Sequence, residues 1–179
     1  ANGTVSYQAP EVGRPGIVRK DTSAVIATVA TLQLNAATRA FLASETFSFT
    51  YISRLNTNDG NTQLRIGVQG STTVNPDDRG IYFEKLNADT NWFCVSRSAA
   101  VETRTNSGIA ITVNFTKFSV VKNSTGVQYF INNIPVCGLI ATNVPTLAIL
   151  PVIQIVNSAA AAKTVDTDYF QISINNLVR

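Results

Sequence analysis

The acidic side chains are the first candidates for acid–base chemistry in this sequence, because the chain contains no histidine. That absence excludes Ser-His and Cys-His catalytic pairs and every His-ligated metal site. Glycosidic hydrolysis needs two carboxylates flanking the scissile bond. Asp166 and Asp168 have the i, i+2 spacing that puts two carboxylates on one side of a strand, whereas Asp77 and Asp78 are adjacent in a proline-containing loop. A solvated or capping pair is the ordinary interpretation near a loop, so we expect no catalytic residue and no enzymatic activity.

One short segment could bind a sugar. Trp92 is the only tryptophan, and it lies beside Asp89 and Asn91, so an exposed indole with nearby carboxylate and amide groups could stack on a sugar ring. The alternative is that Trp92 points into the protein, because it alternates with Phe93 and one of the two must face inward. The sequence leaves both interpretations open.

The sequence predicts no metal site and no cofactor. Calcium would need several Asp and Asn oxygens converging from neighbouring loops. The conceivable suppliers are Asp77, Asp78, Asn87, Asp89 and Asn91. No spacing among them marks a ligand set.

The charge balance of 14 basic and 11 acidic residues is too small and too scattered to predict nucleic-acid binding. No apolar run is long enough to span a membrane. Cys94 and Cys137 both lie in apolar stretches. We expect two buried free thiols, with a disulfide as the alternative in an oxidising compartment.

The elements that must position these residues are strands. Only 14% of the residues are charged, against roughly 25% in an average soluble domain. Thr, Asn and Ser together fill 51 of the 179 positions, which favours strands and turns. Residues 45–55 alternate strictly, with Phe47, Phe49 and Tyr51 on one face. Further short strand-like runs occur at 24–34, 63–69, 81–86, 91–97, 115–123, 127–132, 134–140, 147–156 and 169–174, and residues 100–105 read as a polar strand. Such closely spaced strands predict an all-β, two-sheet antiparallel sandwich or a barrel.

Residues 1–22 differ from the rest and are predicted to form an extended N-terminal arm, followed by one domain over residues 23–179. The arm is rich in glycine and proline and cannot form its own core. We expect it to dock on a partner, and the alternative is that it folds back over its own sandwich. The candidate partner-binding residues are Tyr7, Arg14, Ile17, Arg19 and Lys20.

Three segments resemble a known family. Residues 118–137 contain two apolar strands joined through Tyr-Phe-Ile-Asn-Asn. Residues 78–95 contain Asp-Arg-Gly-Ile-Tyr-Phe and, later, Asn-Trp-Phe-Cys-Val. Residues 163–170 read Lys-Thr-Val-Asp-Thr-Asp-Tyr-Phe. Together they are similar to the concanavalin A-like jelly rolls of tailed-bacteriophage structural proteins. In that family the turn is usually Asn-Gly, since a type I′ turn needs positive φ at both central residues, and Asn133 replaces the glycine here.

The resemblance implies a non-enzymatic virion protein, assembled in the host cytoplasm. The favoured role is a capsid cement or decoration protein that binds the major capsid protein as a homo-oligomer. A receptor-binding tail-fibre domain and a lectin module that binds a surface glycan are the alternatives. Assembly in a reducing cytoplasm would also keep both thiols free.

Overall fold

The computed structural model describes residues 3–33, 41–42, 45–70 and 78–175, and the structural statements below concern these residues. They contain strands and no helix, so no helix within them could cross a membrane. The strands are β1 (Val5–Tyr7), β2 (Val18–Asp21), β3 (Val29–Gln33), β4 (Phe41–Leu42), β5 (Thr46–Leu55), β6 (Thr62–Gln69), β7 (Gly80–Lys85), β8 (Asn91–Ser98), β9 (Val101–Ala110), β10 (Thr116–Asn123), β11 (Gly126–Ile131), β12 (Ile134–Ile140), β13 (Ala148–Asn157) and β14 (Thr164–Asn175).

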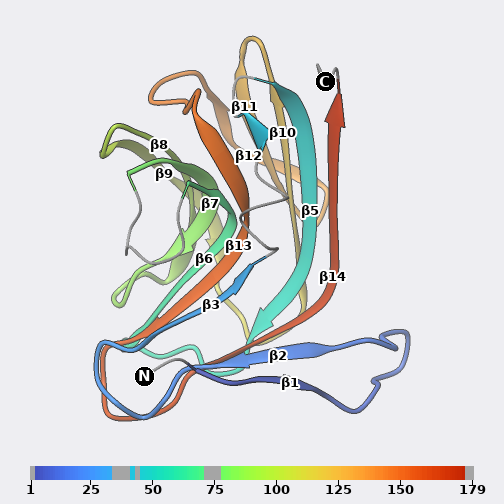
Figure 1. The fold of residues 1–179 in the computed structure, drawn as a ribbon, viewed down its shortest axis with the longest axis vertical. Helices are drawn as coiled ribbons and strands as arrows, with labels where there is room; N and C mark the ends of the chain where they lie inside the picture. Colours follow the sequence, from blue (N-terminus) through green and yellow to red (C-terminus); the bar gives the residue numbers. More distant parts are fainter. Residues whose placement is uncertain (1–2, 34–40, 43–44, 71–77, 176–179) are drawn as a thin grey trace.

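These strands build two antiparallel sheets that pack face to face as a jelly-roll sandwich (Figure 1). The first sheet has the order β1-β2-β14-β5-β10-β11-β12, and the second has the order β3-β13-β6-β7-β8-β9, with β4 also paired to β13. The predicted all-β sandwich is therefore confirmed. Both sheets bend in the same sense, so the outer face of the second sheet is concave and that of the first is convex (Figure 1).

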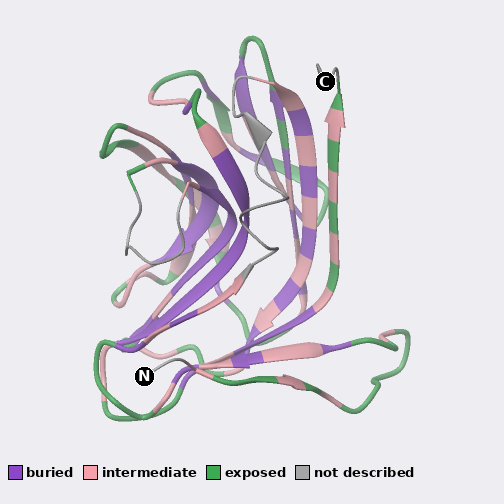
Figure 2. Cartoon of the chain, in the orientation of Figure 1, coloured by how far each residue is buried: buried purple, intermediate pink, exposed green. Residues whose placement is uncertain are grey.

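The core lies between the sheets and follows the two-residue period of the strands. Along β5, buried and half-buried residues alternate without interruption, and Phe47, Phe49 and Tyr51 face inward as predicted. Aromatic rings from both sheets meet there, with Phe83 packed on Phe118 at 5.0 Å between ring centroids. In contrast, β7 and nearly all of β6 and β13 are buried on both faces (Figure 2). The side chains that these three strands point to the concave face are therefore buried, although that face belongs to the outside of the sandwich, whereas β8 and β9 are partly exposed.

Two local features show how single residues fix the strand pairing. Asn132 and Asn133 have φ angles of 50° and 67°, the conformation expected for the turn between β11 and β12. Pro151 lies inside β13, although proline in a sheet is ordinarily confined to the start of a strand or to an edge. On one side of β13, β4 pairs as far as Ile149 and β3 starts at Val152, so the missing N–H of Pro151 falls in the gap between them.

The N-terminal segment forms a hairpin. β1 pairs with β2, and β2 pairs with β14 through residues 18–21 and 164–167, so the segment extends the first sheet. The hairpin then projects beyond the body of the sandwich (Figure 1).

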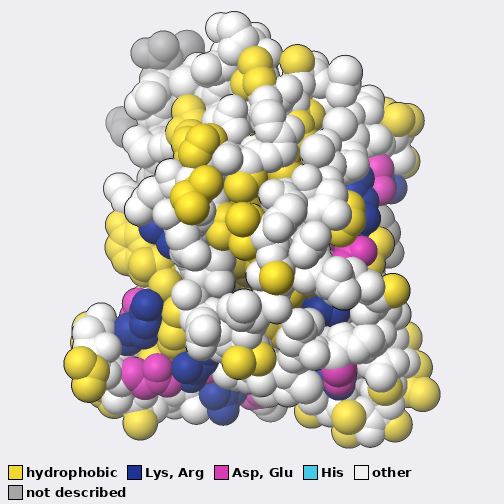
Figure 3. Space-filling view, turned by 180° about the vertical axis from the view of Figure 1, so that it is seen from behind, with side chains coloured by type: hydrophobic (Ala, Val, Ile, Leu, Met, Phe, Trp, Pro, Cys, Tyr) yellow, Lys and Arg dark blue, Asp and Glu magenta, His cyan; other side chains and the backbone are white. Residues whose placement is uncertain are grey.

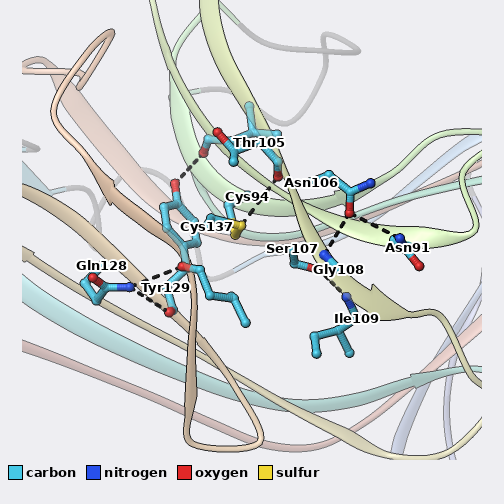
Figure 4. Close-up of a disulfide and its surroundings, with 12 residues drawn as sticks. Asn91, Cys94, Thr105, Asn106, Ser107, Gly108, Ile109, Gln128, Tyr129 and Cys137 are labelled. Carbon is cyan, nitrogen blue, oxygen red and sulfur yellow. Dashed lines mark hydrogen bonds between the residues drawn. A yellow bond between two sulfur atoms is a disulfide. The ribbon is translucent and has the colours of Figure 1, made fainter.

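The prediction of two free thiols is wrong, because Cys94 and Cys137 form a disulfide (Figure 4). Cys94 lies in β8 of the second sheet and Cys137 in β12 of the first, with their Cα atoms 6.3 Å apart. The prediction failed because the apolar pattern of each strand reveals burial but not which strand lies opposite. It also assumed a reducing compartment, which the resemblance alone had implied.

Candidate functional site

The concave face carries rows of polar side chains that run across adjacent strands. Residues directly opposite each other in antiparallel strands point to the same face. One row contains Gln154 of β13, Arg65 of β6 and Glu84 of β7. A second contains Gln69 of β6, Gly80 of β7, Arg97 of β8 and Glu102 of β9. Tyr82 lies on the same face between the two rows, opposite Gly67 and Val95.

The first row is a buried ion-pair network. Arg65 donates from Nε to Glu84 Oε1 at 2.9 Å and from Nη1 to Gln154 Oε1 at 3.1 Å. Arg104 of β9 donates to Glu84 Oε2 at 2.6 Å and also pairs with Asp89. Since both oxygens of Glu84 accept from a guanidinium, and its side chain is only 3% exposed, the network fixes the middle of the face rigidly.

Aromatic rings line the same region. The Arg104 guanidinium lies 3.5 Å from the centroid of the Phe93 ring, and Arg65 lies 6.0 Å from that of Tyr82. Burial raises the pKa of the Tyr82 hydroxyl, with a further contribution from the Glu84 charge, so the group stays protonated and can donate a hydrogen bond.

The second row and the neighbouring Tyr82 contain polar atoms with no partner among the described residues. Within the described part of the chain, both amide atoms of Gln69, the hydroxyl of Tyr82 and Nε of Arg97 are buried without a hydrogen bond. Gln69 is fully buried, and Tyr82 is 1% exposed. Arg97 pairs through Nη1 with Glu102 at 2.6 Å. Each unpaired buried group costs about 1–3 kcal/mol, so three on one face of adjacent strands need an explanation.

The predicted sugar-binding residues are only partly brought together. Asp89 reaches the concave face and pairs with Arg104, and Asn91 donates to Asn106 Oδ1 at 3.3 Å. Trp92, however, is 2% exposed and packs edge-on against Phe118 in the core, so its indole cannot stack on a sugar. Its neighbour in the alternation, Phe93, takes the outward position.

Arginine, glutamine, tyrosine and glutamate side chains that the sequence did not single out build this face, namely Arg65, Gln69, Tyr82, Glu84 and Arg104. A signal existed in residues 63–69, where Gln63, Arg65 and Gln69 alternate with the apolar residues of the core. Alternation can identify an outward-facing polar residue. It cannot show that the residue meets others from three strands.

The acidic pair predicted to be solvated or capping instead anchors the hairpin. Asp166 accepts two hydrogen bonds from Arg19, at 2.7 and 2.9 Å, and two from Arg54, at 3.0 and 2.9 Å. Asp168 accepts from Arg14 at 2.8 Å. Although burial raises the pKa of Asp166, the hydrogen bonds from both guanidinium groups outweigh it and lower the pKa. Figure 3 shows acidic and basic side chains intermixed at the lower left, on the side to which the hairpin projects.

The remaining predicted partner-binding residues have different environments. Ile17 is 1% exposed, and Lys20 is largely buried with its ammonium donating to the carbonyl of Gly3 at 2.9 Å. Both therefore hold the hairpin together. Tyr7 is 87% exposed on β1, the edge strand of the first sheet, and is available to a partner.

The conceivable calcium suppliers do not converge. Asp78 pairs with Arg79, Asn87 accepts from Ser158, and Asp77 lies outside the described residues. No group of three acidic or cysteine side chains able to hold a metal occurs in the described ranges.

The fold matches solved structures, whereas no family model and no curated protein sequence matches this chain. A protein of unknown function from Shewanella oneidensis MR-1 has a TM-score of 0.68 at 12% identity, covering 97% of this chain and 76% of that one. A Bacteroides ovatus GH16 protein of a mixed-linkage glucan locus, solved with an oligosaccharide product, has a TM-score of 0.66 at 10% identity, covering 94% and 85%. The binding domain of botulinum neurotoxin DC, solved with rat synaptotagmin II, has a TM-score of 0.63 at 13% identity, covering 95% and 41%. At these identities the similarity establishes the concanavalin A-like jelly roll.

The prediction that this chain is not an enzyme is contradicted by these comparisons. Glucanases and a laminarinase are built on the same jelly roll, with TM-scores of 0.60–0.66. The prediction rested on the missing histidine and on carboxylates that are close in sequence, and neither criterion covers carboxylates that are brought together across strands. None of the proteins named here is described as a phage protein.

Proposed function

We propose that this chain binds carbohydrate and that the ligand lies along the concave face of the second sheet. The observation that carries the proposal is the set of buried polar groups on Gln69, Tyr82 and Arg97 that have no partner among the described residues. A ligand that supplied hydroxyl groups there would satisfy donors and acceptors together. Buried polar groups without partners are rare in native proteins, and a binding site is one reason for them to persist.

The chemistry of the face fits a neutral polyhydroxylated ligand. Amide, phenol and guanidinium groups offer both donors and acceptors. The three arginines of the face, Arg65, Arg97 and Arg104, are each paired with a carboxylate, which leaves no excess positive charge to select an anion. The GH16 structure with a bound oligosaccharide product supports the choice of a glucan as the first ligand to test.

The test is affinity electrophoresis and calorimetry with mixed-linkage β-glucan and laminarin, together with a reducing-end assay for cleavage. We expect binding that Gln69→Leu weakens about tenfold or more, since the substitution removes both amide atoms. Gln8→Leu is the matched control, because Gln8 lies on the hairpin and bonds only locally to Ser6. A wild-type chain that binds no glucan, or a Gln69→Leu variant that binds as well as wild type, would contradict the proposal.

The role in a phage virion is the competing proposal. That role would require the protein to bind capsid shells that lack it. The purified protein used for the glucan assays can be mixed with such shells to test this. The disulfide between Cys94 and Cys137 favours an oxidising compartment over assembly in a reducing cytoplasm. We therefore infer that the protein works outside the cytoplasm, and particle binding without glucan binding would reverse this choice.

A further inference from the structure

A second hollow lies on the opposite side of the sandwich, under the N-terminal hairpin. It is a groove of about 510 Å³ between the hairpin tip and the convex face, within the range of roughly 300–1,000 Å³ typical of small-molecule sites. Gly13 and Gly16 line it from the tip, and Thr50, Lys117 and Gln171 line it from the sheet. The ion pair between Arg14 and Asp168 holds the tip over this surface.

An irregularity in β14 shapes the groove. The pairing with β5 shifts register between Thr167 and Tyr169, which inserts Asp168 as an extra residue. Before the shift Thr167 is buried, and after it Phe170 packs on the core, so Tyr169 points outward. Bulges of this kind re-aim side chains next to binding sites. Tyr169 is 42% exposed, and its hydroxyl donates to Gln171 Oε1 at 2.6 Å.

An apolar pocket of about 240 Å³ adjoins the groove. It opens between the edges of the two sheets and is lined by Leu32, Tyr51, Pro151, Ile153 and Phe170. Gly16, Asp168 and Tyr169 line both the pocket and the groove, so the two spaces meet at these residues. The groove carries the polar side chains of Thr50, Lys117 and Gln171 beside the apolar Pro15 and Ile52, whereas the pocket is lined mainly by apolar residues. Together the two spaces would accept a molecule with one polar and one apolar end.

We propose that this composite site binds a glycoside whose non-sugar end is apolar. The sugar lies in the groove against the exposed ring of Tyr169, where Lys117 and Gln171 can bond its hydroxyl groups. The apolar end enters the pocket beside Phe170 and Ile153.

This site is independent of the carbohydrate site proposed above. Its residues come from the hairpin, the first sheet, the edge strand β3 and the neighbouring strand β13, whereas the concave face is built by β6–β9 and Gln154 of β13. Variants of the two sites can therefore be compared in one set of measurements.

The experiment is calorimetric titration with three soluble probes, each below its micelle concentration. Octyl β-glucoside carries both ends, methyl β-glucoside only the sugar, and tetraethylene glycol monooctyl ether only the tail. We expect one octyl glucoside per chain, with each half-ligand binding about tenfold or more weakly. Equal affinity for the octyl ether would overturn the assignment of a sugar to the groove, and absence of octyl glucoside binding would overturn the whole proposal.

The variant that blocks the site is Gly16→Phe. A Cβ at Gly16 meets no atom within 4 Å, and its φ is not in the left-handed region, so the new side chain can fill the shared wall without strain. Gly60→Phe is the matched control, since a Cβ at Gly60 makes only an ordinary contact of 3.7 Å with the carbonyl of Asn87. We expect Gly16→Phe to reduce affinity for octyl glucoside about tenfold or more and Gly60→Phe to leave it unchanged.

A second variant controls for the possibility that Gly16→Phe lowers affinity by disturbing the fold. Tyr169→Ala removes the exposed ring without touching the core, and we expect it to weaken octyl glucoside binding about tenfold and to weaken binding of the octyl ether less, because most of the pocket lining remains. Unchanged octyl glucoside affinity in Gly16→Phe or Tyr169→Ala would refute the site. Gln69→Leu should lose glucan binding but keep octyl glucoside binding. This variant therefore separates a failure of one proposal from a failure of the other.

Discussion

Replacing Gln69 with leucine should make the protein more stable. The Gln69 side chain is fully buried on the concave face, and neither amide atom has a hydrogen-bond partner in the described structure. An unpaired buried polar group costs about 1–3 kcal/mol, and leucine has a similar size with no polar atom to desolvate. We expect the free energy of unfolding to rise by about 2 kcal/mol. That corresponds to an increase in Tm of about 4–8 °C for a chain of this length.

Gln154 provides the matched comparison. It is equally buried on the neighbouring strand, but its Oε1 accepts a hydrogen bond from Arg65 at 3.1 Å. Gln154→Leu should therefore lower the free energy of unfolding by about 2 kcal/mol, because the guanidinium loses an acceptor. Urea denaturation and calorimetry of the two variants test the sign directly. If both substitutions destabilise the protein, Gln69 has a partner in solution, and the argument for a ligand at this row fails.

Three further predictions concern the disulfide and the acidic residues. Replacing Cys94 and Cys137 together by alanine should cost about 4 kcal/mol, because the bridge closes a loop with a sequence separation of 43 residues; denaturation with and without reductant measures this. Burial raises the pKa of Asp59. Hydrogen bonds, of which that from Lys163 is the strongest, outweigh this effect of burial and lower the pKa to about 2. Its contribution to stability should be complete above about pH 4 and disappear towards pH 2, and Asp59→Asn should flatten that part of a pH series of denaturation midpoints. Asp166→Asn should cost about 2 kcal/mol and expose the hairpin to limited proteolysis; an unchanged digestion pattern would show that Arg19 and Arg54 are not its anchors.

The fold was predictable because its signals are local. Strict alternation over residues 45–55 identified β5 almost residue by residue, and the asparagines at 132 and 133 identified a turn that the φ angles confirm. Pairing between distant segments was not predictable. Nothing in the sequence indicates that β13 lies between β3 and β6, or that Cys137 lies opposite Cys94.

The carboxylates of the candidate sites show the same limit of prediction from sequence. Asp166 and Asp168 attracted attention because they are close in sequence, but the register shift in β14 and the three arginines around them make them structural anchors. Glu84 was overlooked because no acidic residue lies near it in its own strand. Its partners Arg65 and Arg104 come from β6 and β9. On a sheet, neighbouring functional groups are brought together across strands, so register decides which of them meet, and spacing along one strand does not.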